Sequence, residues 1–137
     1  MDVPEELLRR LTDAAERAAR RAHAPYSRFR VGAAVYTDRE RIVTGCNVEN
    51  ASYGLTMCAE RVAIGRVVAE DAGKPLICAV TGPTDQPLTP CGACRQVLLE
   101  FNPDMVVVCT GRSGRRLVLR AGELLPASFG KGALGVD

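Results

Sequence analysis

The sequence predicts a single α/β domain built on a mixed β-sheet of about five strands, with helices on both faces. The 137-residue chain has the length of one domain, and its 47% hydrophobic and 25% charged residues are those of an ordinary globular protein. Strand and helix patterns alternate as β-α-β-α-β through the middle of the chain, which favours parallel strands covered by helices. Because no linker, repeat or low-complexity segment interrupts the sequence, we expect residues 1–137 to fold as one domain.

The first third of the chain predicts a helix followed by a hairpin. Pro4 suits a first helical position. Apolar residues then recur at helical spacing, namely Leu7, Leu8, Leu11, Ala15, Ala18 and Ala22. We expect this helix to end near residues 23–25. Residues 31–37 and 41–48 are rich in strand-forming side chains and flank a short polar turn, which is typical of a β-hairpin.

The rest of the chain predicts three more strands and three more helices. Apolar segments that end at glycine or proline predict helices over 58–69, 91–101 and 121–125. Shorter apolar runs predict strands over 76–80, 105–109 and 116–119.

Charge and hydropathy argue against nucleic-acid and membrane partners. The net charge is only +2, and the arginines of the first helix alternate with acidic residues, which indicates a solvated helix face. No apolar run approaches the length of a membrane span, and residues 1–10 lack the apolar core of a signal peptide. We therefore expect a cytoplasmic protein whose six cysteines are reduced.

Three of the cysteines form a predicted metal site. Cys91 and Cys94 fall in the opening turn of one predicted helix, so both sulfurs can reach a single ion, and Cys58 begins another helix. Helix N-termini carry partial positive charge, which favours thiolate ligands. Three protein ligands with an open fourth position are typical of catalytic zinc, so we predict one Zn²⁺ per chain. The remaining cysteines, Cys46, Cys78 and Cys109, are interpreted as small hydrophobic residues on strands.

Two charged residues lie close behind Cys58. Glu60 is interpreted as a proton carrier, because zinc acidifies its bound water and a nearby carboxylate can take that proton. A zinc ion with three thiolates is net negative, and Arg61 is expected to offset this charge by hydrogen-bonding the sulfurs. Taken singly, these residues also fit simpler interpretations. The C-x-x-C could be a redox pair or half of a structural zinc site, and Glu60 and Arg61 could be surface residues.

The combination of C-A-E at 58–60 with P-C-x-x-C at 90–94 resembles the signature of the zinc-dependent nucleoside and nucleobase deaminases. With cysteine as the first ligand, the sequence is similar to the small homotetrameric cytidine deaminases. The similarity runs from about Pro25 to Phe129. It includes P-Y-S-x-F at 25–29, V-G-A-A at 31–34, G-C-N-V-E-N-A-S-Y at 45–53 and L-L-P-x-x-F-G at 124–130.

The resemblance implies hydrolysis of cytidine and 2′-deoxycytidine to uridine and 2′-deoxyuridine plus ammonia, in pyrimidine salvage. Zinc-bound hydroxide would attack C4, with Glu60 as the proton shuttle. The implied substrate residues are Phe29 against the pyrimidine, the Ala59 backbone at the base edge, Asn47 and Glu49 on the ribose hydroxyls, and Tyr26, Tyr53 and Phe129 at a pocket shared between subunits of a homotetramer. Lys131 departs from the family pattern, which has proline at this position.

Three alternatives remain open from the sequence. The zinc motif also fits deaminases of other cytosine nucleosides, such as a blasticidin-type antibiotic, although Asn47, Glu49 and Phe129 favour the ribonucleoside. A deaminase of RNA or DNA would need a basic channel, which the net charge of +2 argues against. A non-catalytic zinc module would need a fourth protein ligand.

Overall fold

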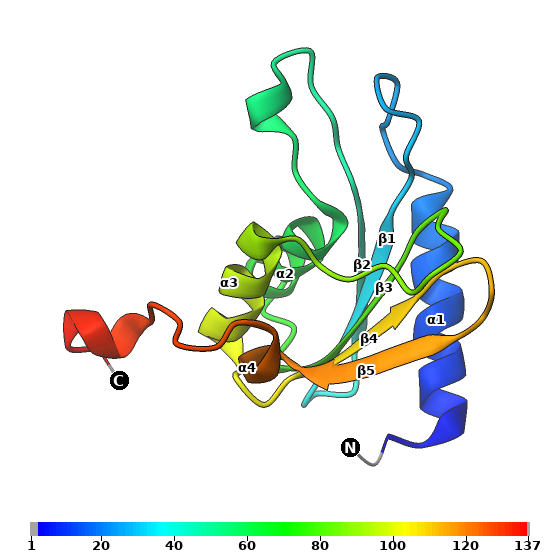
Figure 1. The fold of residues 1–137 in the computed structure, drawn as a ribbon. Coiled ribbons are helices and arrows are strands. Elements are labelled where there is room, and N and C mark those ends of the chain that lie inside the picture. The colour runs from blue at the N-terminus through cyan, green and yellow to red at the C-terminus, as the bar shows by residue number, and fades with distance from the viewer. Residues whose placement is uncertain (1–2, 137) are drawn as a thin grey trace.

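The protein forms one five-stranded mixed sheet with helices on both faces (Figure 1), as the sequence predicts. The structure, a computed structural model, describes residues 3–136. The strands are β1 (Gly32–Thr37), β2 (Ile42–Cys46), β3 (Pro75–Thr81), β4 (Val106–Thr110) and β5 (Arg116–Arg120). The helices are α1 (Glu5–Ala19), α2 (Ala59–Ala69), α3 (Gly92–Phe101) and α4 (Ala121–Leu124), with 3-10 turns at Tyr53–Leu55 and Lys131–Leu134.

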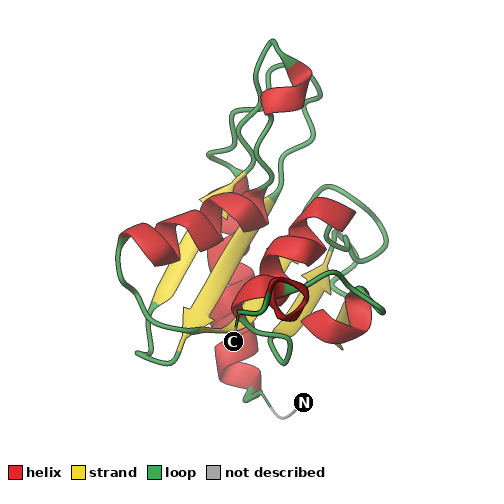
Figure 2. Ribbon diagram, turned by 90° about the vertical axis from the view of Figure 1, so that its left-hand side faces the viewer, coloured by secondary structure: helices red, strands yellow, loops and turns green. Residues whose placement is uncertain are grey.

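The sheet has the strand order β2-β1-β3-β4-β5. Strands β3 and β4 are parallel, and the other neighbouring pairs are antiparallel. The crossover from β3 to β4 runs through α3. This connection brings the N-terminus of α3 to the same end of the sheet as the N-terminus of α2 (Figures 1 and 2).

Two aliphatic cores flank the sheet, because side chains of each strand alternate between its faces. On β1, Val35 packs in the core under α2 and α3, whereas Ala34 packs with Leu11 under α1. Leu98 of α3 and Met105 are fully buried in the larger core. Among residues 3–136, none of the helices combines the length and apolarity that a bilayer crossing requires.

Two element boundaries differ from the prediction by more than one residue. Helix α1 ends at Ala19, several residues earlier than expected, because the next residues turn away to pair with another segment. His23 donates its N–H to the carbonyl of Asn47 at 3.0 Å, and its own carbonyl accepts from Glu49 N at 2.8 Å. The same pairing ends β2 at Cys46, before the predicted residue 48. The 3-10 turn at Lys131–Leu134 was not predicted.

Gly45 sets how closely α2 approaches the sheet. A Cβ atom at this position would lie 2.5 Å from both the carbonyl oxygen of Ala59 and the amide nitrogen of Ala63. These are backbone atoms of the first turns of α2, so they can yield only if the helix moves. The absence of a side chain at Gly45 therefore fixes the depth of the helix that carries Glu60.

We expect Gly45→Val to destabilise the fold by about 1–3 kcal/mol or more, the usual effect of overpacking a core. Urea unfolding followed by circular dichroism measures the change. Gly54→Ala is the matched control, because a Cβ at Gly54 meets open space. An unchanged urea midpoint for Gly45→Val would contradict the tight contact.

Candidate active site

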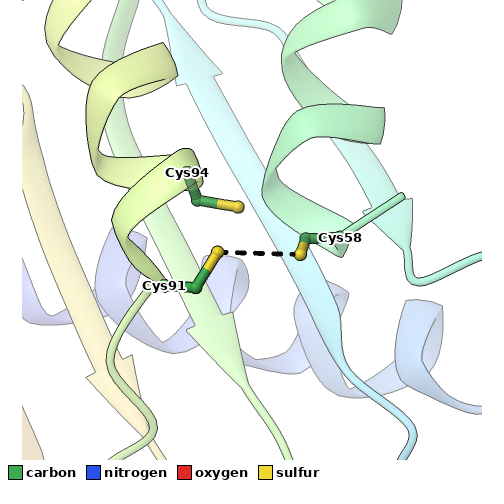
Figure 3. A group of neighbouring side chains, drawn as sticks. All are labelled: Cys58, Cys91 and Cys94. Atoms are coloured by element: carbon green, nitrogen blue, oxygen red, sulfur yellow. Dashed lines mark hydrogen bonds between the residues drawn. The ribbon is translucent and has the colours of Figure 1, made fainter. Parts of the chain in front are cut away.

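Three cysteine sulfurs meet where α2 and α3 begin (Figure 3). Cys58 and Cys91 are the residues that precede the first turn of α2 and α3, and Cys94 lies in the first turn of α3. The sulfurs of Cys58 and Cys91 are 3.8 Å apart, and all three sulfurs lie within 4.8 Å of one another. Thiolates around a tetrahedral zinc, with Zn–S bonds of about 2.3 Å, would be separated by about 3.8 Å. The cluster therefore suits one zinc ion.

The donor set is that of a catalytic zinc site. Within the described part of the chain, no histidine, aspartate, glutamate or further cysteine joins this group of potential ligands. Three protein ligands leave one coordination position for water, whereas structural zinc sites use four. The site thus fits zinc, as predicted, and does not resemble a closed structural module.

Local electrostatics favour thiolate at Cys58. A hydrogen bond from Cys94, assisted by Arg61, lowers the pKa of the Cys58 thiol to about 5 against the opposing effect of burial. The pKa of Cys94 is raised, first by that hydrogen bond and then by burial. The positive ends of α2 and α3 also face the sulfurs. Cys58 is accordingly ready to bind a cation at neutral pH.

Arg61 lies against the sulfur cluster. Its Nη2 atom is 3.5 Å from the sulfur of Cys58 and 3.4 Å from the carbonyl oxygen of Thr56. The hydrogen bond to Cys58 raises the pKa of the Arg61 guanidinium, which favours its charged form. The arginine can therefore supply positive charge beside the thiolates.

Glu60 is buried beside the cysteines, with 4% of its surface exposed. It lines a cavity of about 380 Å³ together with Cys58 and Cys91. Burial raises the pKa of Glu60, and the negative charge of Cys58 acts in the same direction. A divalent cation in the cluster would act in the opposite direction. Such a carboxyl group can both take up and release a proton.

The cavity contains most of the predicted site and some residues that the sequence did not single out. Its predicted lining residues are Phe29, Asn47, Glu49, Cys58, Ala59, Glu60 and Cys91, and its additional ones are Ser27, Val31, Thr56, Leu88 and Thr89. Ser27 could have been found from its place inside the segment P-Y-S-x-F. Leu88 and Thr89 carry no signal beyond preceding Pro90.

Asn47 and Glu49 hold the loop of residues 26–31 in place. The Asn47 side chain accepts from Val31 N at 2.8 Å and donates to the carbonyl of Phe29 at 2.7 Å. The Glu49 carboxylate accepts from the backbone N–H of Tyr26 at 3.0 Å and of Ser27 at 3.1 Å, and from the Ser27 hydroxyl. The Ser27 hydroxyl bond lowers the pKa of Glu49. Both residues thus have a structural role that the sequence did not predict.

Three predicted aromatic residues do not line this cavity. The rings of Tyr26 and Tyr53 pack edge to face at 5.8 Å and border an adjoining cavity of about 230 Å³. Phe129 is 62% exposed and belongs to the segment after α4, where its carbonyl accepts from Gln96 Nε2 at 2.8 Å. Within a single chain, Phe129 therefore contributes nothing to the cavity.

A buried carboxylate beside a three-thiolate zinc centre defines a zinc-dependent hydrolytic deaminase. The comparison with known families agrees, since the cytidine and deoxycytidylate deaminase zinc-binding region matches residues 5–110. The chain belongs to the cytidine and deoxycytidylate deaminase family, and the predicted family, fold class and zinc cofactor are confirmed.

Individual relatives cover nearly the whole chain. The sequence is 47% identical over 116 residues to a cytidine deaminase of Mycobacterium tuberculosis (strain H37Rv), covering 85% of this chain and 84% of that protein. It is 44% identical over 127 residues to a probable cytidine deaminase of Dictyostelium discoideum, covering 91% and 85%. The crystal structure of cytidine deaminase from Burkholderia pseudomallei has a TM-score of 0.86 at 45% identity, covering 93% of this chain and 100% of that one.

Proposed function

We propose that this protein deaminates cytidine and 2′-deoxycytidine to uridine and 2′-deoxyuridine, releasing ammonia. The observation that carries the proposal is the buried Glu60 carboxyl group, which shares one cavity with the cysteines of the zinc centre. The cytidine deaminases at 44–47% identity support the choice of nucleoside.

The reaction needs a proton carrier next to an acidified water. Zinc held by Cys58, Cys91 and Cys94 would supply the Lewis acidity that lowers the pKa of a water molecule. The Glu60 carboxylate is placed to take a proton from a water held at that centre and to pass it to the ring nitrogen as the water oxygen attacks C4. It would then carry the second proton, from the new hydroxyl on C4, to the leaving amine. The bond between C4 and the exocyclic amine nitrogen then breaks, and ammonia departs. Arg61 offsets the negative charge of the thiolates.

Substrate binding uses groups that still have hydrogen-bonding capacity. The Asn47 amide can make four hydrogen bonds and the loop takes two of them, while the Glu49 carboxylate has about four acceptor sites and the loop takes three. Each residue can thus bind a ribose hydroxyl while holding the loop. Phe29 packs against the pyrimidine, and the Ala59 backbone holds the edge of the base.

We expect Glu49→Ala to lower kcat/KM on cytidine by about 10- to 150-fold, the effect of losing one hydrogen bond to a charged group, with zinc content unchanged. Because Glu49 also holds the loop, Ser27→Ala is the matched control, since it removes the hydroxyl's hydrogen bonds with Glu49 and Phe29 N but keeps the carboxylate. We expect a smaller loss for this control. An unchanged kcat/KM for Glu49→Ala would remove this residue from the substrate site.

Exposed aromatic and aliphatic side chains support assembly into a homotetramer. Tyr53 is 75% exposed, Phe129 62% and Val68 on α2 58%, which is unfavourable for large apolar groups unless another surface covers them. In the assembly we propose, Tyr26 and Tyr53 border the shared pocket, and Phe129 of one chain closes the cavity of a neighbour.

Sedimentation at micromolar concentration is expected to give a species near four times the chain mass of 14.7 kDa. Phe129→Ala should raise KM on cytidine, because it removes a wall of the pocket in the neighbouring chain. Exposed Phe101 on α3 provides the control Phe101→Ala. A fully active monomer, or unaltered kinetics for Phe129→Ala, would exclude a pocket completed by a second chain.

The cell compartment and chain organisation complete the proposal. No disulfide joins the six cysteines, all of which lie within residues 3–136. A thiolate metal centre persists in a reducing compartment, so we place the enzyme in the cytoplasm. We also propose that residues 1–137 form a single domain and that the enzyme acts in pyrimidine salvage. Its partners are the nucleoside and copies of itself.

A substrate panel tests the proposed specificity. Ammonia release should be fast with cytidine and 2′-deoxycytidine and slow with a blasticidin-type antibiotic or a cytosine-containing oligonucleotide. Preference for the antibiotic or the oligonucleotide would reassign the substrate, and no release from any of them would support a non-catalytic zinc module.

A further inference from the structure

Two side chains directly after Cys94 contact the end of α4 and the C-terminal segment that follows it, residues 125–136. Arg95 donates from Nη1 to the carbonyl of Leu124 at 3.0 Å, where α4 ends and this segment begins. Gln96 donates from Nε2 to the carbonyl of Phe129 at 2.8 Å. The C-terminal segment is therefore attached to the same helix turn that carries a zinc ligand.

Arg95 also holds the turn that presents Cys91. Its Nε atom donates to the carbonyl of Pro90 at 2.8 Å, immediately before that cysteine. One planar guanidinium thus bridges the metal-binding turn and the end of α4. An arginine suits this role better than a lysine, because its several N–H donors lie in one rigid plane. Within residues 3–136, no carboxylate lies within ion-pair distance of this half-buried arginine, so carbonyl oxygens are its partners.

Little else fixes the C-terminal segment within the chain. None of residues 126–136 is buried. A cavity of about 430 Å³, lined in part by Leu99, Phe101 and Lys131, separates this segment from the second half of α3. Ala127 has a φ of 53°, a left-handed conformation that its side chain disfavours. Within a single chain, Gln96 accordingly holds the segment itself, and Arg95 holds Leu124, the buried residue from which the segment starts.

We propose that Arg95 is a positioning residue that couples metal binding at Cys91 and Cys94 to the docking of the C-terminal segment. A metal ion held by the two cysteines fixes the turn at Pro90, the turn fixes the guanidinium, and the guanidinium fixes the carbonyl of Leu124. The inference rests on the zinc centre of the proposed function, and not on turnover. If Phe129 closes a neighbour's cavity, the metal site of one chain helps to shape the pocket of the next.

Trypsin cleavage after Lys131, which is exposed in the C-terminal segment, measures this coupling. The rate is followed by mass spectrometry for zinc-loaded and chelator-stripped protein, with circular dichroism to verify that the stripped chain stays folded. We expect zinc removal to accelerate cleavage of the wild type about tenfold, the factor for one hydrogen bond to a charged group. Zinc-loaded Arg95→Gln should be cleaved as fast as the zinc-free wild type. Removing zinc from this variant should raise its cleavage rate by less than about twofold.

Two further variants separate coupling from general loosening. Gln96→Ala should speed cleavage without changing the rate at which a chelator removes zinc, whereas Arg95→Gln should speed both. Arg39→Gln is the control. Arg39 lies in the turn between β1 and β2 and also donates to a backbone carbonyl, that of Asp71 after α2. It should leave both rates unchanged.

The coupling would be overturned if zinc removal accelerated cleavage equally in the wild type and Arg95→Gln, or if Arg95→Gln were cleaved no faster than the wild type. Cleavage is measured without substrate. A protein that shows the zinc-dependent protection and fails to deaminate cytidine would therefore refute the proposed function and leave the coupling intact.

Discussion

Glu60→Gln is expected to lower kcat on cytidine by at least about 10²–10⁴-fold, the range that general acid–base groups contribute. The amide keeps the shape of the side chain but cannot accept and return a proton. Because Glu60 is buried beside the cysteines without belonging to the group of potential ligands, zinc content should remain near one ion per chain. Steady-state kinetics and metal analysis on the same sample measure both quantities.

The matched control is Glu100→Gln, the same chemical change at an exposed position of α3. It should leave kcat and zinc content at wild-type values. Near-normal turnover by zinc-loaded Glu60→Gln would mean that another group carries the proton, and loss of zinc from this variant would make Glu60 a ligand instead.

Cys91→Ala is expected to weaken zinc binding strongly and to abolish turnover. Cys91 supplies one of the three sulfurs of the site. Losing a residue that only hydrogen-bonds a metal ligand already weakens metal binding by about 10- to 100-fold. Removing a ligand should therefore weaken zinc affinity by more than about 100-fold. The Cys91 side chain is exposed, so the fold should tolerate the substitution, as circular dichroism would verify.

Cys46→Ala serves as the control for this substitution, because Cys46 lies on β2 outside the sulfur cluster. It should retain one zinc per chain and full activity. Full zinc occupancy in Cys91→Ala would contradict the three-cysteine centre.

The parts of the site that depend on short-range spacing could be predicted from the sequence. Cys91 and Cys94 share one helical turn, and Cys58 and Glu60 lie at the start of another, so local geometry brings their side chains together. The order of strands and helices was equally predictable, because hydrophobic periodicity is a local property. The three cysteines, as ligands of one metal ion, indicated that the N-termini of α2 and α3 meet. The strand order of the sheet explains how they come together.

Features that depend on tertiary pairing could not be predicted. The early end of α1 follows from the hydrogen bonds of His23 with residues 47–49, which no local pattern reveals. The bonds from Asn47 and Glu49 to the loop of residues 26–31 likewise join segments far apart in the sequence. The position of Phe129 outside its own cavity was expected only from the family resemblance, which places it at a pocket shared between subunits, and no local pattern indicates it.

Zinc titration of the metal-free chain, with ammonia release from cytidine as the readout, tests most directly whether Glu60 and the three-cysteine centre form a deaminase site. The proposed mechanism predicts that turnover rises in proportion to zinc and reaches a plateau at about one equivalent per chain. Full turnover in the absence of zinc, or no ammonia at one equivalent, would contradict it.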